Sequence, residues 1–225
     1  MTAELEDSAS LHALIARLYP MMRSITGDGV RETLHVLRDH VDLDVVEVPT
    51  GTPVGDWAVP CEWRFRSAYL ADARGQRVID AAACNLHVLN YSAPIRGRFS
   101  LDELGPHLLT DPARPDVVPY RTSYYAERWA FCLSQRQRDA LAPGDYEAVI
   151  DTEFVDGSLT YGSFVVPGQT GNEIVLTTHI CHPSLANDNC AGLAALTAVL
   201  ASLRPGQLRH TVRGLFIPGT IGSLT

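Results

Sequence analysis

The last third of the chain predicts one β-α-β unit, which constrains the fold more than any other part of the sequence. Residues 174–178 form a short apolar strand pattern, residues 190–203 an apolar helix pattern, and residues 211–217 a second strand pattern. Because such crossovers are almost always right-handed, the two strands should run parallel in one sheet. His179 and Pro218 should then lie at the same edge of that sheet.

The polar segment HICHPSLANDNCAG joins the first of these strands to the helix and is dense in groups that bind metals. In open α/β sheets, ligands bind at the carboxyl ends of the strands. His179 and Asp188 could present an imidazole nitrogen and a carboxylate oxygen at the same height, and both groups are normal zinc ligands. The segment therefore predicts a metal site of the zinc type, with His179 and Asp188 as ligands.

Each polar residue of this segment also has a structural interpretation. His179 could cap the strand end through a backbone hydrogen bond, and Asp188 could be the N-cap of the helix, a role compatible with ligation. For His182 we favour a loop-shaping or substrate-facing role, since His-Pro is a common turn element. We expect Cys181 to be a buried thiol near the site, because nothing in the sequence argues for a lowered pKa.

Composition narrows the classes of partner. The chain has 225 residues, of which 46% are hydrophobic, enough for a proper core. Its formal charge of −8, without any Lys/Arg-rich run, argues against nucleic-acid and anionic-membrane partners. No apolar stretch reaches membrane-spanning length, and the start MTAELEDSAS lacks the order of a signal peptide, so we expect a cytoplasmic protein. Five cysteines without a C-x-x-C pair should be reduced thiols.

The earlier part of the chain predicts an α/β core that is interrupted by a β-rich insertion. Ser10 is a candidate N-cap for a first helix, and a second helix pattern covers residues 30–41. Short strand patterns begin near Trp57, and a hairpin turns at Asp156-Gly157. We expect a discontinuous core of residues 1–56 and 120–225, with an inserted β-rich subdomain of residues 57–119.

Several motifs distributed over nearly the whole chain resemble one bacterial family of aminopeptidase-like zinc exopeptidases, first catalogued as a domain of unknown function. They are SITGDGVRETL, PTGTPVGDWAVP, NLHVLNYSAP, VPYRTSYY, DGSLTYG, THICHPSLANDN and FIPGTIGS. The resemblance implies an aminopeptidase-like mixed sheet flanked by helices, an inserted β subdomain and a C-terminal winged helix. It also implies His179 as a first zinc ligand and Asp188 as a second ligand, which bridges the metals if two zinc ions are bound.

The chain departs from the wider class at two positions. That class has an aspartate two residues after the first histidine, where it orients the imidazole, whereas this chain has Cys181, a much weaker acceptor. The class also has a glutamate pair after the next strand, one as general base and one as ligand. Here the corresponding segment reads IPGTIGS, with Gly219 and Thr220 in place of carboxylates.

These departures leave the expected zinc site incomplete. A catalytic zinc takes about three protein ligands plus water. His182 is one candidate for the third ligand; alternatively, further ligands lie in sequence beyond Thr225. The chain resembles the N-terminal half of the family fold, so we expect it to be truncated, with the strand 211–217 at or near an unfinished sheet edge. A homo-oligomer could form through that edge.

Two functional hypotheses follow. The first is a zinc-dependent aminopeptidase-like hydrolase that acts on a peptide or another small amide, in which the metal polarises the carbonyl and activates water. Because no general base is identifiable, this chain could be inactive on its own. The alternative is a non-catalytic binding or scaffold module that retains the fold.

Overall fold

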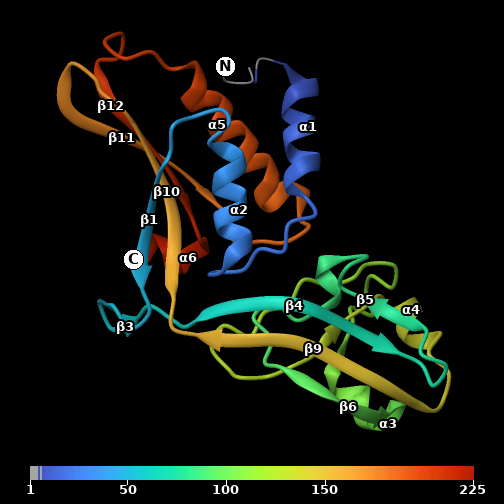
Figure 1. Cartoon of the computed structure of the whole chain (residues 1–225). Helices are drawn as coiled ribbons and strands as arrows, with labels where there is room; N and C mark the ends of the chain where they lie inside the picture. The colour runs from blue at the N-terminus through green and yellow to red at the C-terminus, as the bar shows by residue number, and fades with distance from the viewer. Residues whose placement is uncertain (1–4, 6) are drawn as a thin grey trace. The chain divides into compact units, whose positions relative to one another are not determined.

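The computed structural model describes residue 5 and residues 7–225. The chain divides into two compact units, one formed by the residues up to Glu62 together with residues 155–225, and the other by Trp63–Phe154 (Figure 1). Each unit has its own four-stranded sheet. No helix in the described ranges is long and apolar enough to cross a membrane.

The first unit is built on a mixed sheet with the strand order β1-β10-β12-β11. The outer strand β11 runs parallel to β12, while the other two pairings are antiparallel. The mixed α/β fold and the parallel pair of the β-α-β unit are therefore confirmed. The bounds of the strands are β1 (Asp44–Pro49), β10 (Ser158–Val166), β11 (Thr170–His179) and β12 (His210–Ile217).

The edge strands of this sheet are β1 and β11. The strand predicted at residues 211–217 is β12, which lies between β10 and β11, and the expectation of an unfinished edge stays a prediction. Ile174 and Val175 of β11 are 48% and 50% exposed. Branched apolar side chains on an outer strand offer a surface that can pair or pack with another chain.

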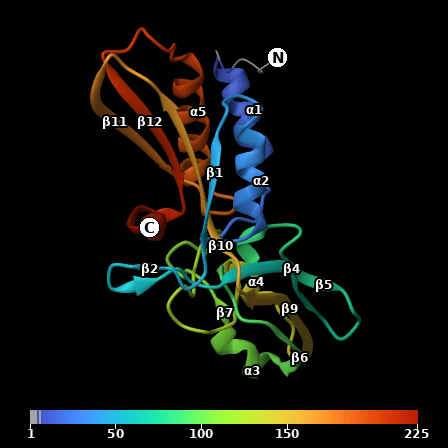
Figure 2. The same cartoon turned by 60° about the vertical axis from the view of Figure 1, so that its left-hand side comes forward.

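Three helices cover one face of the sheet (Figures 1 and 2). They are α1 (Ser8–Leu18), α2 (Asp28–Leu37) and α5 (Gly192–Ser202). Their apolar faces meet β12 in a common core, to which Leu18, Leu34, Leu193 and Phe216 contribute almost completely buried side chains. Burial of this apolar area stabilises the parallel pair from one side.

The first helix begins earlier than the sequence predicted. Asp7, rather than Ser10, is the N-cap of α1, because its carboxylate accepts a hydrogen bond from the backbone N–H of Ser10 at 2.8 Å. The Ser10 hydroxyl belongs to the same capping box. Asp7 and Ser10 are both residue types that favour helix N-termini, so composition alone does not separate the two positions.

The second unit contains an antiparallel sheet with the order β5-β4-β9-β6. Its strands are β4 (Glu62–Ala71), β5 (Arg77–Asp80), β6 (Ile95–Ser100) and β9 (Asp145–Val155). Two helices, α3 (Leu101–Leu104) and α4 (Gln135–Asp139), begin at the capping boxes of Ser100 and Ser134. The remaining short elements are η1 (Asn85–His87), η2 (Gly105–His107), β7 (Leu108–Leu109) and β8 (Phe131–Cys132).

The bounds of the second unit differ from the expected insertion of residues 57–119. Strand β9 lies between β4 and β6, so its backbone hydrogen bonds tie the chain after residue 120 to the second unit. Residues 57–62 group instead with the first unit, where β3 (Trp57–Ala58) pairs with β2 (Pro53–Val54). Long-range strand pairing, which a local pattern does not reveal, sets both boundaries.

Replacing Gly29 by alanine should destabilise the first unit. A Cβ atom at this position of α2 would lie 1.9 Å from the carbonyl oxygen of Met22, so the backbone before the helix would have to move, at a cost of about 1–3 kcal/mol. Gly171→Ala is the matched control, since nothing lies within 4 Å of its Cβ position. Urea unfolding of both variants measures the difference, and equal stabilities would contradict this packing.

Candidate metal centre

The candidate centre lies at the carboxyl end of β11. His179 is the last residue of this strand, and Asp188 lies in the turn η3 (Ala186–Ala191) that leads into α5. His182 lies between the two predicted ligands. Its Nδ1 atom is 3.0 Å from the Oδ1 atom of Asp188, and its ring meets that of His179 edge-on with centroids 6.0 Å apart. The structure thus brings both predicted ligands into contact with the same imidazole.

The donor atoms of this cluster are of the types that zinc binds, but their arrangement does not form a complete ligand set. Imidazole nitrogens and a carboxylate oxygen are the groups that zinc binds in hydrolases. The Asp188 side chain is 62% exposed and the His182 side chain 18% exposed, so the carboxylate is open to an incoming ion. Within the part of the chain that the structure describes, however, no three His, Cys, Asp or Glu side chains form a group that could hold a metal ion.

The structure does not support the capping alternative for Asp188. The N-cap positions of η3 and α5 are occupied by Leu185 and Ala191, and neither position has a side-chain cap. The Oδ1 atom of Asp188 instead lies 3.0 Å from the Nδ1 atom of His182. The Asp188 carboxylate therefore points to His182 rather than to the helix, while its role as a metal ligand stays a prediction.

Cys181 is a buried thiol, as expected. It is 1% exposed, and burial raises the pKa of its thiol to about 12. A neutral thiol is a poor metal ligand and a poor nucleophile. Gly219, which begins α6 (Gly219–Leu224), lies directly against it, because a Cβ at this glycine would be 3.3 Å from the Cys181 sulfur. The edge where the wider class has carboxylates is thus occupied by backbone and a neutral thiol.

Two residues that sequence reasoning missed hold the polar loop in place. Asn189 is 3% exposed, and in the amide orientation that satisfies its neighbours its side-chain oxygen accepts hydrogen bonds from the backbone N–H groups of Cys181 and His182. Arg23, which is completely buried, donates to the carbonyl oxygen of His182 at 2.9 Å. The sequence did contain one indication of the role of Arg23, because this arginine lies within the mainly apolar segment MMRSI.

A hollow of about 390 Å³ lies on the sheet of the first unit, with walls from β10, β11, β12 and the C-terminal residues. By the alternation of side chains along β11, Thr177 in its wall shares a face with His179. Ile217, another wall residue, is the partner of His179 in the register between β11 and β12. The hollow and the side chain of His179 are therefore on the same face of the sheet.

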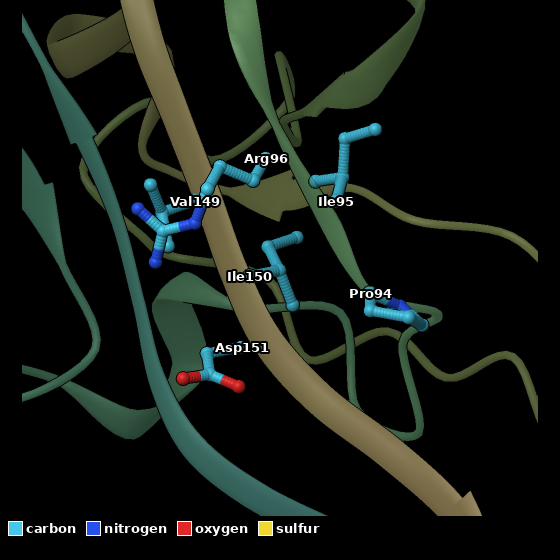
Figure 3. A pocket seen from close by; sticks show the side chains of 6 residues that line it. All are labelled: Pro94, Ile95, Arg96, Val149, Ile150 and Asp151. Carbon is cyan, nitrogen blue, oxygen red and sulfur yellow. The ribbon is translucent and has the colours of Figure 1, made fainter.

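The second unit contains a separate shallow hollow of about 410 Å³ (Figure 3). Its walls come from β6, β9 and the residue before β6, namely Pro94, Ile95, Arg96, Val149, Ile150 and Asp151. One guanidinium and one carboxylate in an otherwise apolar wall give no acid-base pair or ligand set of the kind that hydrolysis requires. The candidate centre is therefore the loop after β11.

Comparisons with known proteins agree with this fold. A Clostridium acetobutylicum protein, named as a presumed polysaccharide biosynthesis protein with an aminopeptidase-like domain, is 46% identical over 220 residues, covering 98% of this chain and 51% of the relative. The crystal structure of a presumed peptidase from the same organism, also 46% identical, matches with a TM-score of 0.96 over 98% of this chain and 52% of that one. The chain thus spans about half the length of these relatives.

A more distant structure shows the same fold. BSAP, a zinc aminopeptidase from Bacillus subtilis, is 11% identical and matches with a TM-score of 0.60 over 98% of this chain and 64% of that protein. At this identity the likeness concerns the fold alone. The family model described as a domain of unknown function, DUF4910, matches residues 12–225. The chain therefore belongs to the DUF4910 family and has an aminopeptidase-like fold, as the resemblance of its motifs implied.

Proposed function

We propose that this chain carries the zinc-binding loop of an aminopeptidase-like hydrolase that acts on a peptide or another amide bond. The observation that supports the proposal most directly is the His179, His182 and Asp188 cluster, which lies at a strand end in a fold that BSAP, named a zinc aminopeptidase, also has. Bound zinc would polarise the amide carbonyl and lower the pKa of a water molecule.

In this proposal each residue of the cluster has a separate task. His179 and Asp188 would hold the metal, because both residues are exposed whereas the His182 side chain is only 18% exposed. His182 orients the Asp188 carboxylate through the 3.0 Å contact, or joins as a third ligand when its ring turns. The hollow on the same face of the sheet as His179 would hold the group next to the cleaved amide, with the Thr177 hydroxyl available for hydrogen bonding.

The substrate can be narrowed to two classes of amide. BSAP, which has the same fold, is named a zinc aminopeptidase, and this name favours a peptide with a free N-terminus. The name of the Clostridium relative joins an aminopeptidase-like domain to polysaccharide biosynthesis, which favours the amide of a modified sugar. Since no carboxylate stands at Gly219, the general base is missing from the centre described above, and losing such a group commonly lowers the rate about 10²–10⁴-fold. We therefore expect slow turnover.

The second candidate function is a binding or scaffold module without catalysis. The neutral Cys181 thiol and the backbone of Gly219, where the wider class has carboxylates, favour it. The two candidates make different predictions for zinc and for turnover. Zinc binding with amide hydrolysis supports the first candidate, whereas a zinc-free protein supports the second.

Zinc affinity should depend on the two predicted ligands. Isothermal titration of the metal-free protein should show about one zinc ion bound. Loss of a residue that only orients a metal ligand typically weakens metal binding about 10–100-fold. His179→Ala and Asp188→Asn remove ligands themselves, so each should weaken zinc binding by at least this factor. The control is His35→Ala, an exposed histidine of α2. Unchanged affinity in the first two variants, or no zinc binding at all, would remove the basis of the metal proposal.

Zinc should also stabilise the folded protein. A ligand that binds only the native state adds about 2.7 kcal/mol at a free concentration 100 times its Kd, because binding draws the equilibrium away from the unfolded chain. Thermal unfolding with zinc should therefore shift upward by several degrees, and excess chelator should reverse the shift. The same protocol on His179→Ala should give no shift; an equal shift there would place the metal elsewhere.

Amide hydrolysis should depend on the bound zinc. The zinc-loaded 225-residue protein would be incubated with a library of free N-terminal peptides and, separately, with N-acyl amino sugars, and products would be counted by mass spectrometry. We expect release of N-terminal residues or of the acyl group that is lost on His179→Ala. Product formation equal to that of the His179→Ala variant in both arms would leave only the binding module.

A further inference from the structure

Arg23 is completely buried, with 0% of its surface exposed. Among the described residues it is the only charged side chain near the candidate loop that is buried to this extent. It lies between α1 and α2, far from the loop in sequence. Burial lowers the pKa of its guanidinium, since the charged form loses its hydration. A buried charge is costly, and apolar side chains of similar volume often stabilise a core as well or better. Packing alone therefore does not explain why an arginine occupies this position.

The contacts of Arg23 supply such a reason. Its Nε atom donates to the carbonyl oxygen of His182 at 2.9 Å, and its Nη2 atom lies 3.1 Å from the sulfur of Cys190. These two partners stand at the beginning and at the end of the loop that contains Asp188. One planar guanidinium thus bridges both ends of the loop, which the single ammonium of a lysine cannot reproduce.

The same guanidinium is anchored to two helices. Its Nη1 atom donates to the carbonyl oxygen of Leu18 at 2.7 Å, at the C-terminus of α1, and to the hydroxyl of Thr33 in α2 at 3.3 Å. The Ser184 hydroxyl of the same loop also donates a hydrogen bond to the carbonyl oxygen of Tyr19 at 3.2 Å. The loop is therefore fixed to the helical layer rather than only to the strand that precedes it.

The path from Arg23 to the candidate ligands passes through His182. Arg23 fixes the backbone of His182, and the His182 ring contacts both the Asp188 carboxylate and the His179 ring. Partners that orient a metal ligand without touching the metal commonly change metal affinity 10–100-fold. Loosening the backbone of His182 should therefore displace the Asp188 carboxylate.

From this arrangement we infer that Arg23 is a positioning residue for the candidate metal centre, which holds His182 and Asp188 in register by bridging the two ends of their loop. The inference rests on the proposed function for its metal part. Its structural part concerns the order of the loop in the metal-free protein and can be measured without any metal.

The test compares four variants of the whole chain. Arg23→Lys keeps the charge but loses the fork of donors, and Arg23→Met keeps the volume but loses all of them. Cys190→Ala keeps the arginine and removes one partner, so it remains informative if both arginine variants fail to fold. Val212→Ala, which reduces the same core at a position of β12 opposite Ile174, is the control for loss of stability alone.

Two readouts separate positioning from stability. Hydrogen exchange of the metal-free proteins, followed by mass spectrometry, should become faster in the peptide covering residues 180–190 of the Arg23 variants and of Cys190→Ala, while the β12 peptide stays protected. Cobalt added as a spectroscopic substitute for zinc should bind about 10–100-fold more weakly in these variants, with altered visible bands. The Val212→Ala control should leave both readouts unchanged.

The inference is overturned if the Arg23 variants exchange and bind metal as Val212→Ala does. If the unaltered protein binds neither zinc nor cobalt, the proposed function fails, and the exchange of residues 180–190 alone decides the role of Arg23. Faster exchange confined to this loop then upholds the positioning role, and unchanged exchange removes it.

Discussion

Parallel pairing between β11 and β12 is the constraint on which the candidate centre depends. The crossover through α5 forces both strands to end at one edge, where His179 lies opposite Ile217. The helices support the pair from one side through a core centred on Leu193 and Phe216. The polar loop therefore starts from a rigid strand end and finishes on a buried helix, which is the support that a binding site on a loop needs.

Local sequence patterns predicted those elements whose structure depends mainly on neighbouring residues. The strand, loop, helix and strand between residues 174 and 217 follow from apolar periodicity, and the motifs identified the family. The role of Arg23 did not follow, because its guanidinium reaches a carbonyl 159 residues later in the chain. The bounds of the second unit were missed for the same reason, since β9 is placed by hydrogen bonds to strands far earlier in sequence.

The sequence named His179 and Asp188 as candidate ligands, and their role as ligands stays a prediction. His179 and Asp188 do come together, through the ring of His182. The neutral Cys181 thiol and the close backbone of Gly219 leave the opposite edge without a carboxylate. In the described part of the chain the loop is thus ordered by buried contacts and carries an open carboxylate at Asp188, while metal binding and turnover stay proposals.

The most direct test of this account is X-ray absorption at the zinc edge of the zinc-loaded protein. Ligation by His179 and Asp188 predicts a first shell of nitrogen and oxygen at about 2.0–2.2 Å, with imidazole scattering that weakens in His179→Ala. A sulfur shell at about 2.3 Å would contradict the account, because it would place the metal on a cysteine thiolate. A spectrum identical in His179→Ala would contradict it equally.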